Sequence, residues 1–158
     1  MKSFLTLAAF VVAISLYSLP LAVADEVTFG DLTISHPQAR PNLPNRPTAA
    51  YMKITNDGET DESLVSATSP AFGKIEIHTV VKNGEVMKML PVVDVPVPAG
   101  TTAELKAGGL HLMLFDAKEM LKDGAMFPVT LTFEKGGAVE IMVKVDRRAG
   151  QGHGGHNH

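Results

Sequence analysis

Short apolar runs, separated by turn-forming residues, fill the chain between residues 27 and 145. Within each run the apolar side chains recur at every second position, as in Leu110-His111-Leu112-Met113-Leu114. A period of two indicates a strand that is buried on one face, and no long segment has the period of an amphipathic helix. The pattern therefore predicts an all-β domain.

Nine of these runs are long enough to form strands, and nine short strands favour a two-sheet sandwich. The expected strands are 27–34, 49–55, 64–68, 74–81, 85–90, 102–105, 110–114, 127–133 and 138–145. Segment 36–47 contains four prolines, which predicts an ordered extended loop or a sheet edge. Segment 118–124 is expected to form one helical turn.

The first 24 residues have the layout of an export signal, which predicts a periplasmic protein. Lys2 precedes an apolar run over residues 4–16, and Ala22-Val23-Ala24 stands before the acidic Asp25. The alternative is a retained membrane anchor over residues 4–23, but Pro20 and the small-residue ending favour cleavage after Ala24. We expect a signal peptide (1–24), one domain (25–149), a Gly- and His-rich tail (150–158), and no membrane anchor in the mature form.

The composition excludes several classes of site and partner. The chain contains no cysteine, so it has no disulfide, no thiol to acylate, and no ligand for a blue-copper centre, a zinc ribbon or an iron–sulfur cluster. The formal charge is −3, and it becomes one unit more negative when Lys2 is removed with the signal. This charge argues against binding to nucleic acid or to acidic lipid.

The dipeptide Asn83-Gly84 lies between two alternating runs and predicts a β-hairpin with a type I′ turn. With Asn83 and Gly84 as the two central residues, Lys82 pairs with Glu85 and every other opposed pair is fixed. His78 is then opposite Met89. By the same register Val80 faces Met87, Ile77 faces Leu90 and Ile75 faces Val92, which leaves the apolar side of the hairpin complete without the methionines.

A second His/Met pair lies in the run 110–114, where His111 and Met113 share the face opposite the leucines. A methionine in a strand usually fills a gap in the core, and a single histidine is usually a surface or hydrogen-bonded group. Here the alternation places both pairs on faces that the core does not use. Thioether sulfur and imidazole nitrogen suit a soft metal, above all Cu(I), so we expect a metal site near the surface.

The spacing of these four residues resembles a known signature. His78, ten residues, Met89, twenty-one residues and then His111-x-Met113 match the H-x10-M-x21-H-x-M pattern of the PCu(A)C family of periplasmic copper chaperones. The similarity includes segments 50–56, 76–78 and 108–114 and extends over roughly residues 27–145. It implies a cupredoxin-like Greek-key β-sandwich that binds Cu(I) through His78, Met89, His111 and Met113. It also implies delivery to the copper centre of cytochrome oxidase, with a cytochrome oxidase subunit or a Sco-type protein as partner.

The chain contains further potential donors outside this signature. Met87 is a reserve sulfur ligand or, as we favour, a hydrophobic cover. The tail histidines His153, His156 and His158 are candidate auxiliary ligands for Cu(II), the alternative being a solvated end with incidental histidines. His36 and Met142 are considered as helpers of the tail, although simple exposure is the favoured fate of His36.

Two other functional classes stay open at this stage. An enzyme is not expected, because the sequence has no nucleophile elbow and no carboxylate-rich metal motif, and four protein ligands leave no open position on the metal. A non-enzymatic module for copper storage or scavenging, or a β-sandwich that only binds partners, is the alternative to a chaperone. A one-electron carrier ranks well below the chaperone, because no thiolate is present and the ligands favour Cu(I).

Overall fold

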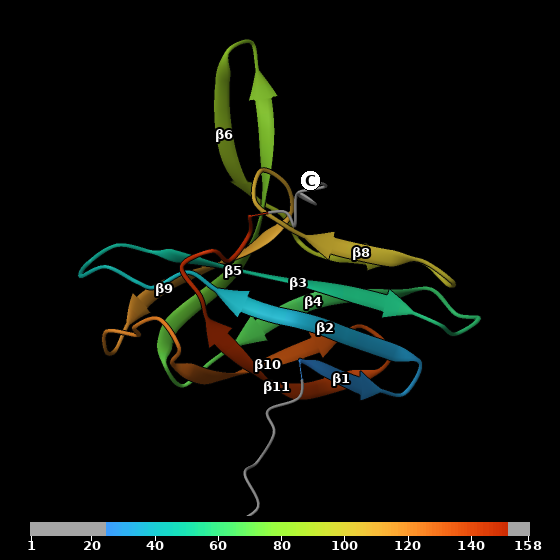
Figure 1. Cartoon of the computed structure of the whole chain (residues 1–158). Helices are drawn as coiled ribbons and strands as arrows, with labels where there is room; N and C mark the ends of the chain where they lie inside the picture. The colour runs from blue at the N-terminus through green and yellow to red at the C-terminus, as the bar shows by residue number, and fades with distance from the viewer. Residues whose placement is uncertain (1–24, 152–158) are drawn as a thin grey trace, which may run out of the picture.

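The computed structural model describes residues 25–151, which form eleven β-strands and no helix, and hence no helix that could cross a membrane (Figure 1). The expected signal peptide and the tail histidines lie outside the described residues. The strands are β1 (Glu26–Phe29), β2 (Leu32–Ala39), β3 (Thr48–Asn56), β4 (Glu62–Thr68), β5 (Phe72–Asn83), β6 (Val86–Pro91), β7 (Val95–Val97), β8 (Thr102–Leu105), β9 (His111–Ala117), β10 (Met126–Phe133) and β11 (Gly137–Val145). The prediction of an all-β fold is confirmed.

The strands follow one another in the order β6-β5-β9-β3-β2-β11-β10-β4-β7, with β1 on β2 and β8 on β3. All pairs are antiparallel except β2 with β11. The sheet folds back on itself, because β4 also packs against β5, and β7 against β3 and β8. The core between the layers includes the fully buried Ile34, Leu112, Leu131 and Phe133. On β9 the buried Leu112 lies on the opposite face from its neighbours His111 and Met113, as the period of two requires.

The number of strands differs from the nine expected, at two places. The expected strand 27–34 is a hairpin of β1 and β2, which turns at Gly30 with φ of 59°. A positive φ costs glycine almost nothing, so the two residues Gly30 and Asp31 are enough to reverse the chain between Phe29 and Leu32. The short β7 was not expected because of its proline, but Pro96 lies on an edge strand, where a missing N–H is tolerated.

The prediction for 36–47 is only partly right, because β2 extends as far as Ala39. A bulge at His36, with φ of 52°, allows the strand to continue beyond Pro37. The expected helical turn at 118–124 is wrong. Instead, the side chain of the buried Asn42 forms hydrogen bonds with the backbone of this segment. Its amide NH₂ donates to the carbonyl oxygen of Glu119, and its amide oxygen accepts from the N–H of Leu121.

The β5–β6 hairpin projects from the body of the molecule (Figure 1), and its register differs from the expected one. Asn83 pairs with Val86, so Gly84 and Glu85 are the central residues. Of these two residues only Gly84 has a positive φ (64°). A type II′ turn needs a positive φ at the first central residue only, whereas a type I′ turn needs it at both, so the turn is of type II′. His78 therefore faces Pro91, and Met89 faces Val80. The expected pairs Ile77–Leu90 and Ile75–Val92 do not form: Leu90 pairs with Thr79, and the N–H of Val92 donates to the carbonyl oxygen of Ile77. A shift of two residues leaves the paired side chains on their expected faces.

Candidate metal centre

Three adjacent strands carry the four predicted ligands. His78 on β5 lies directly opposite His111 on β9, and their ring centroids are 6.0 Å apart. Met113 follows on β9 opposite Glu76, while Met89 on β6 lies diagonally across from His78. Diagonal neighbours on one face of a sheet are still within reach of a long side chain. The structure thus brings together the residues that the sequence predicted, although in a different pairing.

Each imidazole uses one ring nitrogen for a hydrogen bond and leaves the other free. Nε2 of His78 lies 2.9 Å from Oε2 of Glu76, and Nδ1 of His111 lies 2.9 Å from the carbonyl oxygen of Gly109. A carbonyl or carboxylate oxygen can only accept, so these nitrogens carry the protons. The buried Nδ1 of His78 and Nε2 of His111 have no hydrogen-bond partner among the described residues. These two nitrogens are left without a partner in a buried place, where an unpaired polar atom is costly.

The two histidines are more buried than expected. His78 is 9% exposed and His111 is 3% exposed, so the prediction of ligands on polar surface faces is wrong for the imidazoles. They are nevertheless outside the hydrophobic core, which contains Ile77 and Leu112 on the opposite face. Aromatic rings cover them instead: Tyr51 lies 6.5 Å from His111 and Phe115 lies 6.1 Å from His78, measured between ring centroids.

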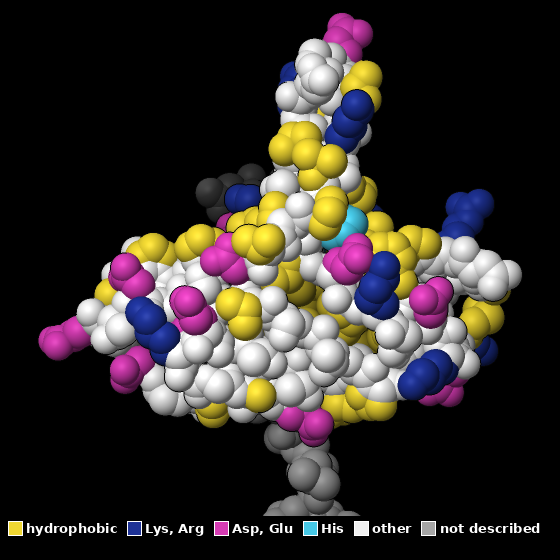
Figure 2. All heavy atoms as spheres, turned by 180° about the vertical axis from the view of Figure 1, so that it is seen from behind, with side chains coloured by type: hydrophobic (Ala, Val, Ile, Leu, Met, Phe, Trp, Pro, Cys, Tyr) yellow, Lys and Arg dark blue, Asp and Glu magenta, His cyan; other side chains and the backbone are white. Residues whose placement is uncertain are grey.

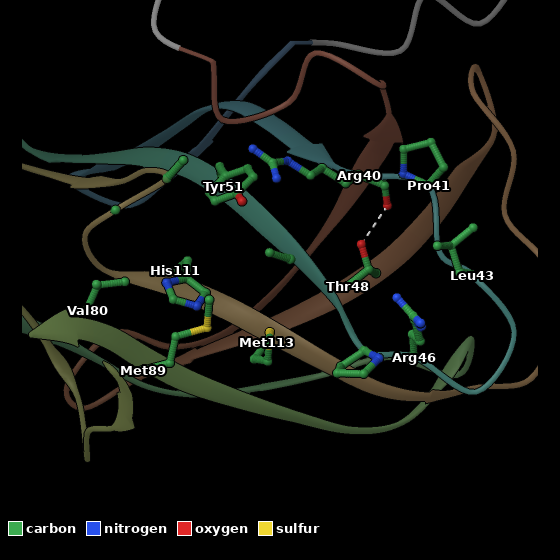
Figure 3. A pocket seen from close by; sticks show the side chains of 14 residues that line it. Arg40, Pro41, Leu43, Arg46, Thr48, Tyr51, Val80, Met89, His111 and Met113 are labelled. Carbon is green, nitrogen blue, oxygen red and sulfur yellow. Dashed lines mark hydrogen bonds between the residues drawn. The ribbon is translucent and has the colours of Figure 1, made fainter. Parts of the chain in front are cut away.

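A cavity of about 410 Å³ opens beside these residues and is lined by His111, Met89 and Met113. Both methionines direct their side chains toward it (Figure 3). Met89 is 56% exposed and is therefore the ligand that solvent reaches most easily. On the face shown in Figure 2, histidine is visible only at the base of the projecting hairpin. The site thus combines buried imidazoles with accessible sulfur.

Electrostatic contacts hold the carboxylate beside His78 in its charged form. The hydrogen bond from His78, followed by that from Lys74 at 2.9 Å, keeps the pKa of Glu76 below its usual value. At the other side of the cavity, burial raises the pKa of Tyr51, and the positive charge of Arg40 opposes this rise only in part. The chain therefore presents an ionised acceptor to His78 and a neutral phenol beside His111.

The remaining predicted donors within the described residues lie away from the cavity. Met87 is 58% exposed and faces Lys82 toward the end of the hairpin, on the same side of β6 as Met89. His36 is exposed in the β2 bulge, and Met142 is 37% exposed opposite Pro128. Neither lines the cavity with Met89, His111 and Met113. His153, His156 and His158 lie outside the described residues.

Sequence reasoning did not find four residues that shape the site: Glu76, Tyr51, Arg40 and Arg46. Glu76 could have been found, because it is two residues from His78 and hence on the same face of one strand. The other three come from β3 and the 40–47 loop, and only the tertiary fold places them at the cavity. Tyr51 is also packed closely against Gly150, beyond the last strand.

Comparison with known proteins identifies the family. The model of the family described as "Putative lipoprotein LpqE-like" matches residues 32–145. The chain belongs to the LpqE-like family. A relative described as "Putative lipoprotein Lxx21020", from Leifsonia xyli subsp. xyli (strain CTCB07), is 36% identical over 99 residues, which are 62% of this chain. The chain spans only 60% of the length of that relative.

Solved structures of PCuAC domains have the same fold, which confirms the resemblance to the PCuAC family and the cupredoxin-like β fold. The apo PCuAC domain from PmoF1 is 32% identical with a TM-score of 0.66, over 77% of this chain and 98% of that one. The copper-bound PCuAC domain from PmoF2 is 25% identical with a TM-score of 0.67, over 77% and 97%. The CuI form of DR1885 from Deinococcus radiodurans is 29% identical with a TM-score of 0.57, over 80% and 83%. This LpqE-like chain therefore has the fold of the PCuAC domains.

Proposed function

We propose that the protein is a periplasmic, non-enzymatic copper chaperone that holds Cu(I) through His78, Met89, His111 and Met113. The observation that carries the proposal is the pair of buried, partner-free nitrogens, Nδ1 of His78 and Nε2 of His111. Hydrogen bonds on the opposite ring nitrogens fix the orientation and tautomer of both rings, as is usual for histidine ligands of metals. Two thioether sulfurs beside the same cavity supply the soft donors that Cu(I) prefers.

The ligand set suits release as well as binding. Imidazole and thioether are neutral and weaker donors to Cu(I) than thiolate, so transfer to an acceptor with deprotonated cysteines is favourable. We propose that the acceptor belongs to the assembly of the copper centre of cytochrome oxidase, either the oxidase subunit itself or a Sco-type protein. An export signal cleaved after Ala24 fits this location, and so does the lipoprotein name of the family.

Two accessory roles belong to the same proposal. We propose that His153, His156 and His158 bind Cu(II), because imidazole-rich segments suit that ion better than Cu(I). Met87 is proposed as a cover of the hairpin surface that can serve as a reserve sulfur ligand. It lies on the same side of β6 as Met89, but nearer the turn.

An anaerobic Cu(I) titration of the mature chain tests the ligand assignment. We expect about one tightly bound equivalent, and weaker binding after each of the changes His78→Ala, Met89→Ala, His111→Ala and Met113→Ala. The matched controls His36→Ala and Met142→Ala remove the same side-chain types away from the cavity and should leave Cu(I) binding unchanged. Equal uptake by all six variants would contradict the assignment.

Two further measurements separate the parts of the proposal. Removal of residues 152–158 should reduce Cu(II) binding and spare Cu(I) binding, since Gly150 and its packing against Tyr51 are retained. Mixing the copper-loaded chain with candidate acceptors should move the ion to one of them. Tight binding without transfer to any cysteine-bearing acceptor would favour copper storage or scavenging instead.

A further inference from the structure

The charged side chains that line the copper cavity are both cationic. Arg40 and Arg46 line it, and no aspartate or glutamate among the described residues does so. This local charge is opposite to that of the whole chain, whose formal charge is −3. A cavity built only to attract a copper cation would be expected to carry the opposite sign, because like charges repel.

Contacts within the fold hold Arg40 at the cavity. Its Nε donates to the carbonyl oxygen of Ala149 at 3.1 Å, and its guanidinium carbon lies 5.7 Å from the centroid of the Tyr51 ring. Neither contact neutralises the charge. No ion pair to a carboxylate forms from Arg40 anywhere in residues 25–151.

Arg46 reaches the cavity from the other end of the 40–47 loop (Figure 3). Its backbone N–H donates to the carbonyl oxygen of Leu43, which closes a turn at this end of the loop. Within the described part of the chain its side chain has no ion pair either. Two guanidinium groups therefore line the same cavity as Met89, Met113 and His111. Among the described residues, no carboxylate forms an ion pair with either of them.

We propose that Arg40 and Arg46 form a docking site for the anionic cysteine-thiolate arm of a copper acceptor protein. This inference rests on the proposed function, because it requires Cu(I) at the His/Met site. Positive charge lowers the pKa of a nearby thiol and so favours the thiolate, which is the nucleophile and the metal ligand. It also raises the local concentration of an anionic partner and speeds its encounter with the chain.

The transfer step is a ligand exchange without a change of oxidation state. The acceptor thiol loses its proton to solvent as it enters the positive field, and its sulfur forms a bond to Cu(I). The bond from Cu(I) to a thioether sulfur of the chain then breaks. Met89 is the ligand best placed to leave, because it is 56% exposed on the projecting hairpin and the histidines are buried. The neutral thioether needs no proton when it departs.

A stopped-flow experiment on the full mature chain, loaded with one equivalent of Cu(I), tests the docking site. The first acceptor is an end-blocked peptide with two cysteines and no other ionisable side chain. The second is neocuproine, a neutral Cu(I) chelator. We expect Arg40→Gln/Arg46→Gln to slow transfer to the peptide by roughly tenfold, which is within the usual range of electrostatic steering. Transfer to neocuproine should change less than about twofold, because a neutral acceptor gains little from the two charges.

Two further variants serve as a control and a safeguard. Arg147→Gln/Arg148→Gln removes the same charge from exposed side chains that do not line the cavity, and it should transfer copper like the wild type. Arg46→Gln alone retains the Arg40 contact with Ala149 and should still slow the peptide reaction if the double variant does not fold. Equal slowing with both acceptors, equal slowing in the control, or no slowing at all would each overturn the docking site. Absence of Cu(I) uptake by the wild type would instead overturn the proposed function.

Discussion

At the scale of single residues, the two imidazoles differ in which nitrogen they leave free. His78 is held through Nε2 and His111 through Nδ1, so the free atoms are Nδ1 and Nε2 respectively. The two rings lie opposite each other on neighbouring strands. While both hydrogen bonds are kept, an ion between the rings would be bound by Nδ1 of His78 and by Nε2 of His111. The acceptors Glu76 and the carbonyl of Gly109 therefore decide the geometry of the site as much as the ligands do.

Glu76→Gln should weaken Cu(I) binding by about tenfold, the lower end of the usual effect of losing the hydrogen-bond partner of a ligand. A neutral amide accepts more weakly from Nε2 of His78 and can also turn its NH₂ group toward the ring. A competition titration with a Cu(I) chelator measures the change. Glu104→Gln, an exposed carboxylate that pairs with Lys53 and Lys106, is the matched control. Equal affinities of the two variants would show that Glu76 does not position His78.

At the scale of elements, the β5–β6 hairpin is the part of the site with the least support. All six residues of β6 are exposed, and β6 is the edge strand of the sheet. A two-stranded ribbon on its own is only marginally stable in water. The position of Met89, a candidate ligand, therefore depends on the turn at Gly84.

Gly84→Ala should loosen this hairpin. Its φ of 64° would cost an alanine about 1 kcal/mol, although no atom lies within 4 Å of the added Cβ. We expect faster amide hydrogen exchange in β6, unchanged exchange in β10 and β11, and weaker Cu(I) binding. Gly137→Ala, with φ of 85° and the same open space, puts the same strain into the turn before β11. That control should leave β6 and copper affinity unchanged, and a loss of affinity in it would mean that the effect is not local to the hairpin.

At the scale of the whole molecule, segments far apart in sequence meet at the cavity. Tyr51 of β3 covers His111 of β9 and is itself packed against Gly150, after the last strand. Arg40 bonds to the carbonyl oxygen of Ala149 in the same place. The end of the folded domain therefore supports the wall of the cavity beside His111.

Gly150→Ala should impair the site from a distance. The added Cβ would lie 2.5 Å from a carbon of the Tyr51 ring, so the ring must move away from its place beside His111. Gly124→Ala is the matched control, because Gly124 has a similar positive φ (87°, against 75°) and open space around it. Both variants should lose about 1 kcal/mol of stability in urea unfolding from backbone strain, and Gly150→Ala should lose more because of its contact with Tyr51. Only Gly150→Ala should bind Cu(I) more weakly. Equal Cu(I) affinity of the two variants would show that the position of the Tyr51 ring does not affect Cu(I) binding.

The sequence by itself determined the all-β class, the face on which each ligand lies and the four candidate ligands. These follow from a period of two, which assigns side chains to faces without reference to any other strand. The tertiary structure decided what depends on the partner strand or on distant segments. A single positive φ at Gly84 moved the hairpin register by two residues, and Asn42 replaced the expected helical turn by its own hydrogen bonds. Burial of the histidines and the placing of Tyr51, Arg40 and Arg46 also required the folded sheet, because residues separated by many positions in sequence become neighbours only when the strands pair.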